Sequence, residues 1–285
     1  MAEFAGMNSV TVGDIKVTFL ADGGGIINAV AMFPASGDPA GWEAYSRLLD
    51  GEGNVHPTIG GFLIEVGDQK IAVDMGLGPM RLDFPGFGPF IGGDYMDSLE
   101  QTGIAREDVT DVVYTHLHLD HVGWTSIEVN GQRELMYPNA RHMTSQTEWD
   151  FWHGQDHPVG PNIEAVQQPL AGIIEFISEG DEIAPGVTVV STPGHTPGHI
   201  SLFITVGDER LCLAADLLHS ESQLYEPTWS VPFDNDPIEA RATREAMYDE
   251  LTQPNTLTAL GHFSNQVFGH LSQDGDQYVW TPLES

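Results

Sequence analysis

Alternating hydrophobic and polar residues predict strands in the first third of the chain. Residues 9–23, "SVTVGDIKVTFLADG", alternate and end in glycine, a pattern typical of strand–turn–strand. Residues 60–66, "GGFLIEV", and 69–76, "QKIAVDMG", are separated by a short polar turn and predict a hairpin. Residues 94–104, "DYMDSLEQTGI", predict a helix that ends near Gly103.

Residues 108–115 predict a buried strand that completes the first half of the chain. The second half repeats this order, with a strand over residues 186–195 that ends in a histidine loop and a hairpin over residues 199–219. A helix over 234–254 and a strand over 256–260 follow. Because each half contains strands and then a helix, we expect an internally duplicated α/β fold with two β-sheets face to face and helices outside.

No linker divides the chain, so residues 1–285 are predicted to form a single domain. Residues 23–58 are rich in glycine and proline, with one short helical stretch at 41–50, "GWEAYSRLLD", and predict a long loop excursion. This excursion is either a lid over a site or a contact in a homodimer, and its sequence does not separate the two.

The composition favours a globular protein. Hydrophobic residues make up 41% of the chain, enough for a sizeable core, while the longest apolar runs are too short to cross a bilayer. The first residues lack a basic region followed by an apolar stretch, so no signal peptide is expected. The one cysteine, Cys212, lies in an apolar run and is predicted to be a buried, inert thiol. These features favour the cytoplasm.

The charge limits the classes of partner. Asp and Glu number 42 against 10 Lys and Arg, a formal net charge of -32. No basic patch can neutralise a nucleic-acid backbone or an anionic membrane, so neither is an expected partner. The simplest interpretation is a solubility feature; a sharper one is that the field disfavours anionic substrates. We therefore expect a neutral small-molecule substrate.

The densest group of chemical side chains lies in "VVYTHLHLDHVGW", residues 112–124, which contains His116, His118, Asp120 and His121. If the strand continued, His116 and His118 would point to the same side and could hold one ion. Because His121 must point elsewhere, the cluster suits two adjacent ions better than one. Imidazole with carboxylate favours Zn²⁺, with Mn²⁺, Fe²⁺ or Co²⁺ as competitors.

Two catalytic ions need about six to seven protein ligands, more than this cluster supplies. His195, Asp216 and His262 follow later predicted strands and provide the missing number. The chain has 12 histidines, most of which have no such pattern. Spacing alone therefore does not decide whether His195, Asp216 and His262 are metal ligands.

Several motifs, taken in order, resemble the metallo-β-lactamase superfamily: "IAVDMG", "THLHLDH", "STPGHTPGH", "LAADLLH" and "LTALGHF". The resemblance covers about residues 10–270 and implies an αββα four-layer sandwich. It also implies two divalent metal ions, the first held by His116, His118 and His195, the second by Asp120, His121 and His262, with Asp216 between them. It makes His199 structural and Asp74 an acceptor for a ligand histidine.

The chain looks most similar to the branch that contains quorum-quenching lactonases and methyl-parathion-hydrolase-like phosphotriesterases. This resemblance rests on residues 88–104 and 136–152 and on the long excursion. It implies a hydrolase that uses a metal-bridging hydroxide on a neutral, fairly apolar lactone or ester, in the manner of N-acyl-homoserine lactonases. The alternatives are a phosphotriesterase and a non-enzymatic metal-binding protein.

Two residues are candidates for catalysis beyond metal binding. Asp120 is placed to orient the hydroxide and carry its proton, as the resemblance implies. His219 stands where such lactonases commonly have tyrosine, three residues after Asp216. It either donates a hydrogen bond to the substrate or is a bystander. Eight aromatic residues in loop-like contexts are candidates for pocket walls or core: Phe84, Phe87, Phe90, Trp124, Trp149, Trp152, Trp229 and Phe233.

Overall fold

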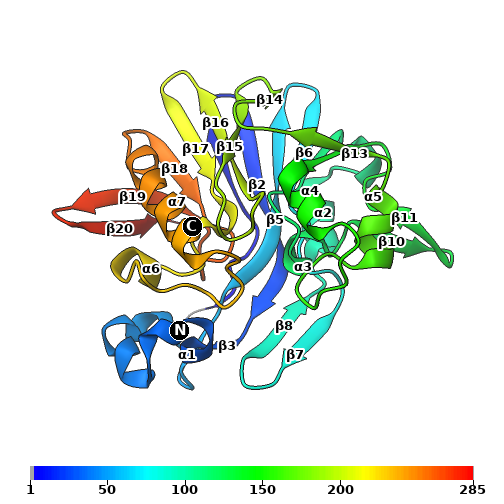
Figure 1. Cartoon of the computed structure of the whole chain (residues 1–285). Helices are drawn as coiled ribbons and strands as arrows, with labels where there is room; N and C mark the ends of the chain where they lie inside the picture. The colour runs from blue at the N-terminus through cyan, green and yellow to red at the C-terminus, as the bar shows by residue number, and fades with distance from the viewer. Residues whose placement is uncertain (1–2, 285) are drawn as a thin grey trace.

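The computed structural model describes residues 3–284, and it consists of two β-sheets packed face to face with helices on both outer faces (Figure 1). The predicted αββα sandwich is therefore confirmed. The first sheet has nine strands in the order β13-β12-β9-β6-β5-β2-β8-β7, with β1 beside β2. Its strands are β1 (Asn8–Val12), β2 (Ile15–Gly25), β5 (Thr58–Val66), β6 (Gln69–Val73), β7 (Arg81–Phe84), β8 (Gly88–Gly92), β9 (Asp111–Val113), β12 (Arg141–Ser145) and β13 (Ile174–Ile177).

The second sheet has seven strands in the order β14-β15-β16-β17-β18-β19-β20. They are β14 (Glu182–Ala184), β15 (Val187–Ser191), β16 (Ile200–Val206), β17 (Glu209–Leu213), β18 (Thr256–Ala259), β19 (Phe268–Asp274) and β20 (Gln277–Pro282). Two small ribbons stand apart, β3 (Ile27–Asn28) with β4 (Asn54–Val55), and β10 (Ser126–Val129) with β11 (Gln132–Leu135).

The helices divide between the two outer faces (Figure 1). On the side of the first sheet are α2 (Tyr95–Thr102), α3 (Leu119–Val122), α4 (Gln146–Trp152) and α5 (Gln168–Leu170). On the side of the second sheet are α6 (Ser222–Tyr225) and α7 (Pro237–Leu251). Two helix ends agree with the residues that predicted them. Gly103 ends α2 in a left-handed conformation with φ 76°, and the Asp236 side chain accepts hydrogen bonds from two amides at the start of α7.

The alternation of side chains along the strands builds the layers. In β2, Phe19 points into the core between the sheets, where Leu202 of β16 also lies. Its neighbour Leu20 points outward into a second core with Leu99 of α2. Cys212 faces a third core with Met247 of α7, which confirms that it is buried. A strand buried on both faces therefore needs apolar residues at consecutive positions.

The duplication is visible in the strand pairing. In the first half, β5 and β6 form an antiparallel hairpin, α2 follows, and β9 returns parallel to β6. In the second half, β16 and β17 form the hairpin, α7 follows, and β18 returns parallel to β17. Because the carboxyl ends of parallel neighbours lie at the same edge, each half brings an aspartate loop beside a histidine loop.

The excursion at 23–58 is more structured than a loop. Residues 23–25 still belong to β2, which is longer than predicted. The short helix α1 (Ala29–Met32) is followed by 3₁₀ helices at Pro34–Ser36 and Pro39–Leu48, and the second of these overlaps the helical stretch expected at 41–50. Phe33 and Trp42 pack with Trp229 in a core of their own. The segment lies at the same end of the molecule as the β7–β8 hairpin (Figure 1).

Within residues 3–284, no helix is both long and apolar enough to cross a membrane.

Candidate metal centre

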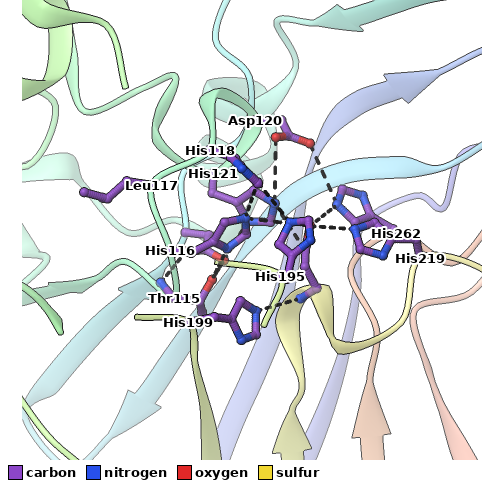
Figure 2. A network of polar contacts seen from close by, with 12 residues as sticks. Thr115, His116, Leu117, His118, Asp120, His121, His195, His199, His219 and His262 are labelled. Atoms are coloured by element: carbon purple, nitrogen blue, oxygen red, sulfur yellow. Dashed lines mark hydrogen bonds and ion pairs between the residues drawn. The ribbon is translucent and has the colours of Figure 1, made fainter. Parts of the chain in front are cut away.

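All seven predicted metal ligands come together at one edge of the sandwich, and Figure 2 shows six of them pointing toward one another from separate segments. His116 follows the last residue of β9 by three positions, as Asp216 follows β17 and His262 follows β18. His195 follows β15 by four. The strand ends therefore position ligands that lie far apart in the sequence.

The central motif does not have the geometry that its spacing suggested. Strand β9 ends at Val113, so His116 and His118 lie in a loop. Helix α3 starts directly after His118, and Asp120 and His121 are neighbours within its single turn. The strand therefore does not continue through this motif: the pair His116 and His118 lies in a loop and the pair Asp120 and His121 in a helix, and neither pair is positioned by the alternation of a strand. In space, His116 and His118 group with His195, and Asp120 and His121 group with His262, while His116 and His121 also form a group with Asp216.

The first group of ligand atoms comes from three histidines. The Nε2 atom of His116 lies 3.1 Å from Nδ1 of His118, and that Nδ1 lies 2.9 Å from Nε2 of His195. All three side chains are buried. Burial lowers the pKa of His116 and His118 well below the usual value, which favours the neutral imidazole that binds metals.

The second group joins α3 to the loop after β18. Asp120 Oδ1 lies 3.9 Å from Nε2 of His121, and its Oδ2 lies 3.8 Å from Nε2 of His262. Burial opposes the charged form of His121, but the carboxylates of Asp216, Asp74 and Asp120 outweigh it and raise its pKa. Asp120 is the more exposed member, with 18% of its side chain accessible.

The carboxylate of Asp216 lies between the two groups. It is buried in the turn Ala215–Leu217. Five Nε2 atoms surround it, those of His262 at 3.0 Å, His219 at 3.1 Å, His121 and His195 at 3.2 Å, and His116 at 3.7 Å. Burial raises the pKa of Asp216, but the surrounding histidines dominate and lower it well below its usual value.

This donor set fits divalent cations. Three imidazole nitrogens of the first group face one another at hydrogen-bonding distance, an arrangement that a shared cation satisfies better than shared protons. His121 Nε2 is buried and, within the described chain, has no hydrogen-bond partner. Within each group, the ligand atoms lie within 4.8 Å of one another, and the groups together include both imidazoles and carboxylates.

Asp74 orients one of these histidines. Its Oδ2 accepts a hydrogen bond from Nδ1 of His121 at 2.9 Å, which leaves Nε2 to face the cluster. Its two oxygens also accept from the amide and hydroxyl of Thr115, at 2.8 and 2.7 Å. The contact expected between Asp74 and a ligand histidine is therefore present. Asp74 has φ 58°, a left-handed conformation that turns the chain sharply after β6.

Two further acceptors fix ligand histidines, and the sequence pattern did not reveal them. Asp234 Oδ1 accepts from Nδ1 of His195 at 2.8 Å. The backbone oxygen of Thr58 accepts from Nδ1 of His262 at 2.8 Å. Neither acceptor lies in a motif, because each reaches its histidine only through the packing of distant segments. Such contacts hold the ring and fix which nitrogen faces a metal.

Glu148 is a third residue that the sequence did not mark. It is fully buried in α4, and burial raises the pKa of its carboxyl group. Its oxygens accept from the amide of Leu117 at 2.9 Å, the amide of Gly198 at 3.1 Å and Nε1 of Trp152 at 2.8 Å. Since Leu117 lies between two ligands and Gly198 follows a third, Glu148 ties two ligand loops together.

His199 lies outside the ligand groups. Its Nδ1 contacts the oxygens of Thr192 at 2.8 and 3.0 Å, and its Nε2 accepts from the amide of Asp216 at 3.2 Å. Burial lowers the pKa of His199 to about 3. This agrees with the structural role expected for His199, which holds the backbone of the central aspartate.

A comparison of His195 with His199 tests this assignment. We expect His195→Ala to lower the metal content by about one ion per chain, because one ion loses a ligand. We expect His199→Ala to keep its full content at saturating metal, with affinity weakened by about 10- to 100-fold as its contact is indirect. Elemental analysis and metal titration of both purified variants measure this. Loss of an ion from the His199 variant alone would contradict the assignment.

A pocket of about 570 Å³ opens onto the cluster. Four of the eight aromatic candidates line it: Phe84, Phe87, Phe90 and Phe233. The four tryptophans belong instead to buried cores. Met32 and Pro57 of the excursion also line the pocket, as does His219, whose ring stacks on His262 with centroids 5.3 Å apart.

The four-layer fold and the histidine–aspartate cluster at the strand ends define a metal-dependent hydrolase. The chain belongs to the metallo-beta-lactamase superfamily, whose family model matches residues 61–262. The matched range contains every predicted ligand.

Related proteins agree with this membership. An N-acyl homoserine lactonase of a Bacillus species is 28% identical over 156 residues, which cover 50% of this chain and 56% of the relative, so the match spans little more than half of that protein. The solved structure of AidC, a dizinc quorum-quenching lactonase in complex with a product, has a TM-score of 0.84 at 23% identity and 99% coverage of both chains. The hydrolase AbOPH has a TM-score of 0.81 at 26% identity, again with 99% coverage of both.

Proposed function

We propose that this protein is a dinuclear metal-dependent hydrolase of neutral, fairly apolar lactones or esters, similar to N-acyl-homoserine lactonases. The observation that carries the proposal is the apolar, phenylalanine-lined pocket that ends at the histidine–aspartate cluster. The formal charge of -32 also disfavours anionic substrates.

The proposed ligands divide into two sets, with Asp216 shared: His116, His118 and His195 in one, and Asp120, His121 and His262 in the other. Two bound divalent cations supply a nucleophile at neutral pH by lowering the pKa of water, and they polarise the carbonyl group under attack. Zn²⁺ is the proposed metal, because imidazole and carboxylate suit it.

The protein's own side chains supply orientation and proton transfer. We assign Asp120 to orient the attacking water and to hold its proton, since it is the most exposed carboxylate of the cluster. We assign His219 to donate a hydrogen bond toward the carbonyl or leaving oxygen, since it lines the pocket beside Asp216. Phe87 and Phe233, whose rings meet edge to face at 5.3 Å, exclude water and hold the apolar part of the substrate.

The excursion at 23–58 completes the pocket in this proposal. Met32 and Pro57 form part of its wall, which favours a lid over a dimer contact. Tyr45 donates to Glu226 at 2.7 Å, and Arg47 pairs with Glu221 through both of its terminal nitrogens. These contacts fasten the lid to the segment that carries α6.

A panel of neutral substrates tests the proposal. We expect the metal-loaded enzyme to hydrolyse an acyl-homoserine lactone with a kcat/KM above that for an aryl ester or an aryl phosphotriester, because the pocket is apolar and His219, the assigned hydrogen-bond donor, lines it beside the cluster. Matched measurements on one metal-loaded preparation decide the ranking. A phosphotriester kcat/KM far above the lactone value would favour a phosphotriesterase, and no turnover of the whole panel would favour a metal-binding protein.

A further inference from the structure

A second, larger cavity shares His219 and His262 with the phenylalanine pocket. Its walls come from the excursion, α6, the loop after β18 and strand β20, and it encloses about 1530 Å³ of space open to the surface. We call it the rear cavity. Its polar lining includes Arg47, Ser220, Glu221, Ser264, Gln266 and Glu284.

Three residues line both cavities: Pro57, His219 and His262. The two imidazole rings stack at an interplanar angle of 12°, and each residue is 7% exposed. Figure 2 shows them side by side at one flank of the cluster. Asp216 lines the phenylalanine pocket but not the rear cavity. The two rings therefore border the rear cavity and also contact the Asp216 carboxylate, at 3.0 Å from Nε2 of His262 and 3.1 Å from Nε2 of His219.

The two cavities differ in chemistry. The phenylalanine pocket, from here on the front pocket, is lined by phenylalanines and other apolar residues, apart from the cluster itself. The rear cavity also has apolar residues in its walls, but it adds serines, amides and charged groups outside the cluster that the front pocket lacks, with Arg47 Nη1 donating to Glu221 at 2.7 Å. Polar walls with several hydrogen-bonding groups hold water, and each molecule needs about 30 Å³. A wall of aromatic and aliphatic side chains does not.

We propose that the rear cavity supplies the water that each hydrolysis consumes. This inference rests on the proposed function. Ester or lactone cleavage breaks the acyl carbon–oxygen bond and joins the oxygen of one water molecule to the acyl carbon. One proton of that water goes to the leaving oxygen, and the other is released as the product acid ionises. A long apolar substrate that fills the front pocket closes that route to water, so the next molecule enters past His219 and His262.

Narrowing the rear cavity tests the proposal. Val279→Trp and Ser264→Trp add bulk from two different walls. The substrates are a short-chain and a long-chain member of one class, chosen from the lactones, aryl esters or phosphotriesters that the unmodified enzyme hydrolyses. We expect kcat for the long-chain substrate to fall about tenfold in both variants, and kcat for the short-chain substrate to stay within about twofold, because the short chain leaves the front route open.

Ser272→Trp on β19 is the matched control, since Ser272 is exposed and does not line either cavity. Metal content and melting temperature of each variant show whether the fold and the metal centre are intact. Equal loss with both chain lengths, or no loss with either, would overturn the water route. The choice of substrate class keeps this result separate from the proposed function, which fails if neither lactones nor esters are hydrolysed.

Discussion

Asp216→Ala is expected to abolish the metal centre and the hydrolase activity together. The Asp216 carboxylate is the only one that the structure places within 3.7 Å of histidines from both ligand groups, among the residues described. Without it, both proposed ions lose a ligand and the negative charge between them. We expect metal content to fall below about one ion per chain and kcat/KM to fall at least about 1,000-fold, equivalent to about 4 kcal/mol of transition-state stabilisation.

Elemental analysis after dialysis and steady-state kinetics on the preferred panel substrate measure both effects. Asp208→Ala is the matched control, because Asp208 is exposed in the turn between β16 and β17 on the same hairpin. A variant at position 216 that retained two ions and near-normal activity would show that the cluster is not the catalytic centre.

The sequence predicted the fold and the first four residues of the histidine–aspartate cluster because both leave local signals. Hydrophobic and polar residues alternate along β2, whereas β16 is mostly apolar. Both patterns reflect how many faces of the strand are buried, and both can be recognised from neighbouring residues alone. The dense His116–His121 motif needs no distant partner to be recognised. The three later ligands depended on the family resemblance, since the strand ends that bring them together are separated by many residues.

The sequence did not reveal hydrogen bonds to the ligand loops that form only when distant segments pack together. Three acceptors form hydrogen bonds with partners far away in the sequence: Asp234 with a partner 39 residues away, Glu148 with one 31 residues away, and the backbone oxygen of Thr58 with one 204 residues away. A buried carboxylate has no signature in composition, since 42 acidic residues are present and most are exposed. Helix α3 was missed for a different reason. Its single turn after His118 is too short for any periodic pattern to appear.

Asp22 is the most consequential of these unmarked carboxylates. It is fully buried at the end of β2 and lies outside the metal cluster. Oδ2 accepts from the amides of Leu77 at 2.7 Å and Gly78 at 3.1 Å. Oδ1 accepts from the amides of Gly93 and Tyr95 and from Nε1 of Trp124, at 2.9 to 3.0 Å. The side chain thereby joins the loop after β6, the start of α2 and the segment after α3.

Asp22→Ala is expected to lower the free energy of unfolding by about 4–6 kcal/mol, because each buried donor left without a partner costs about 1–3 kcal/mol and local rearrangement recovers part of that. Urea denaturation of the metal-free protein measures the change without a contribution from bound metal. Asp14→Ala is the matched control, since Asp14 is exposed in the turn before β2. If both variants unfolded at the same urea concentration, the Asp22 network would not stabilise the fold. If the loss is confirmed, the loops around the metal centre depend on a carboxylate that never touches a metal.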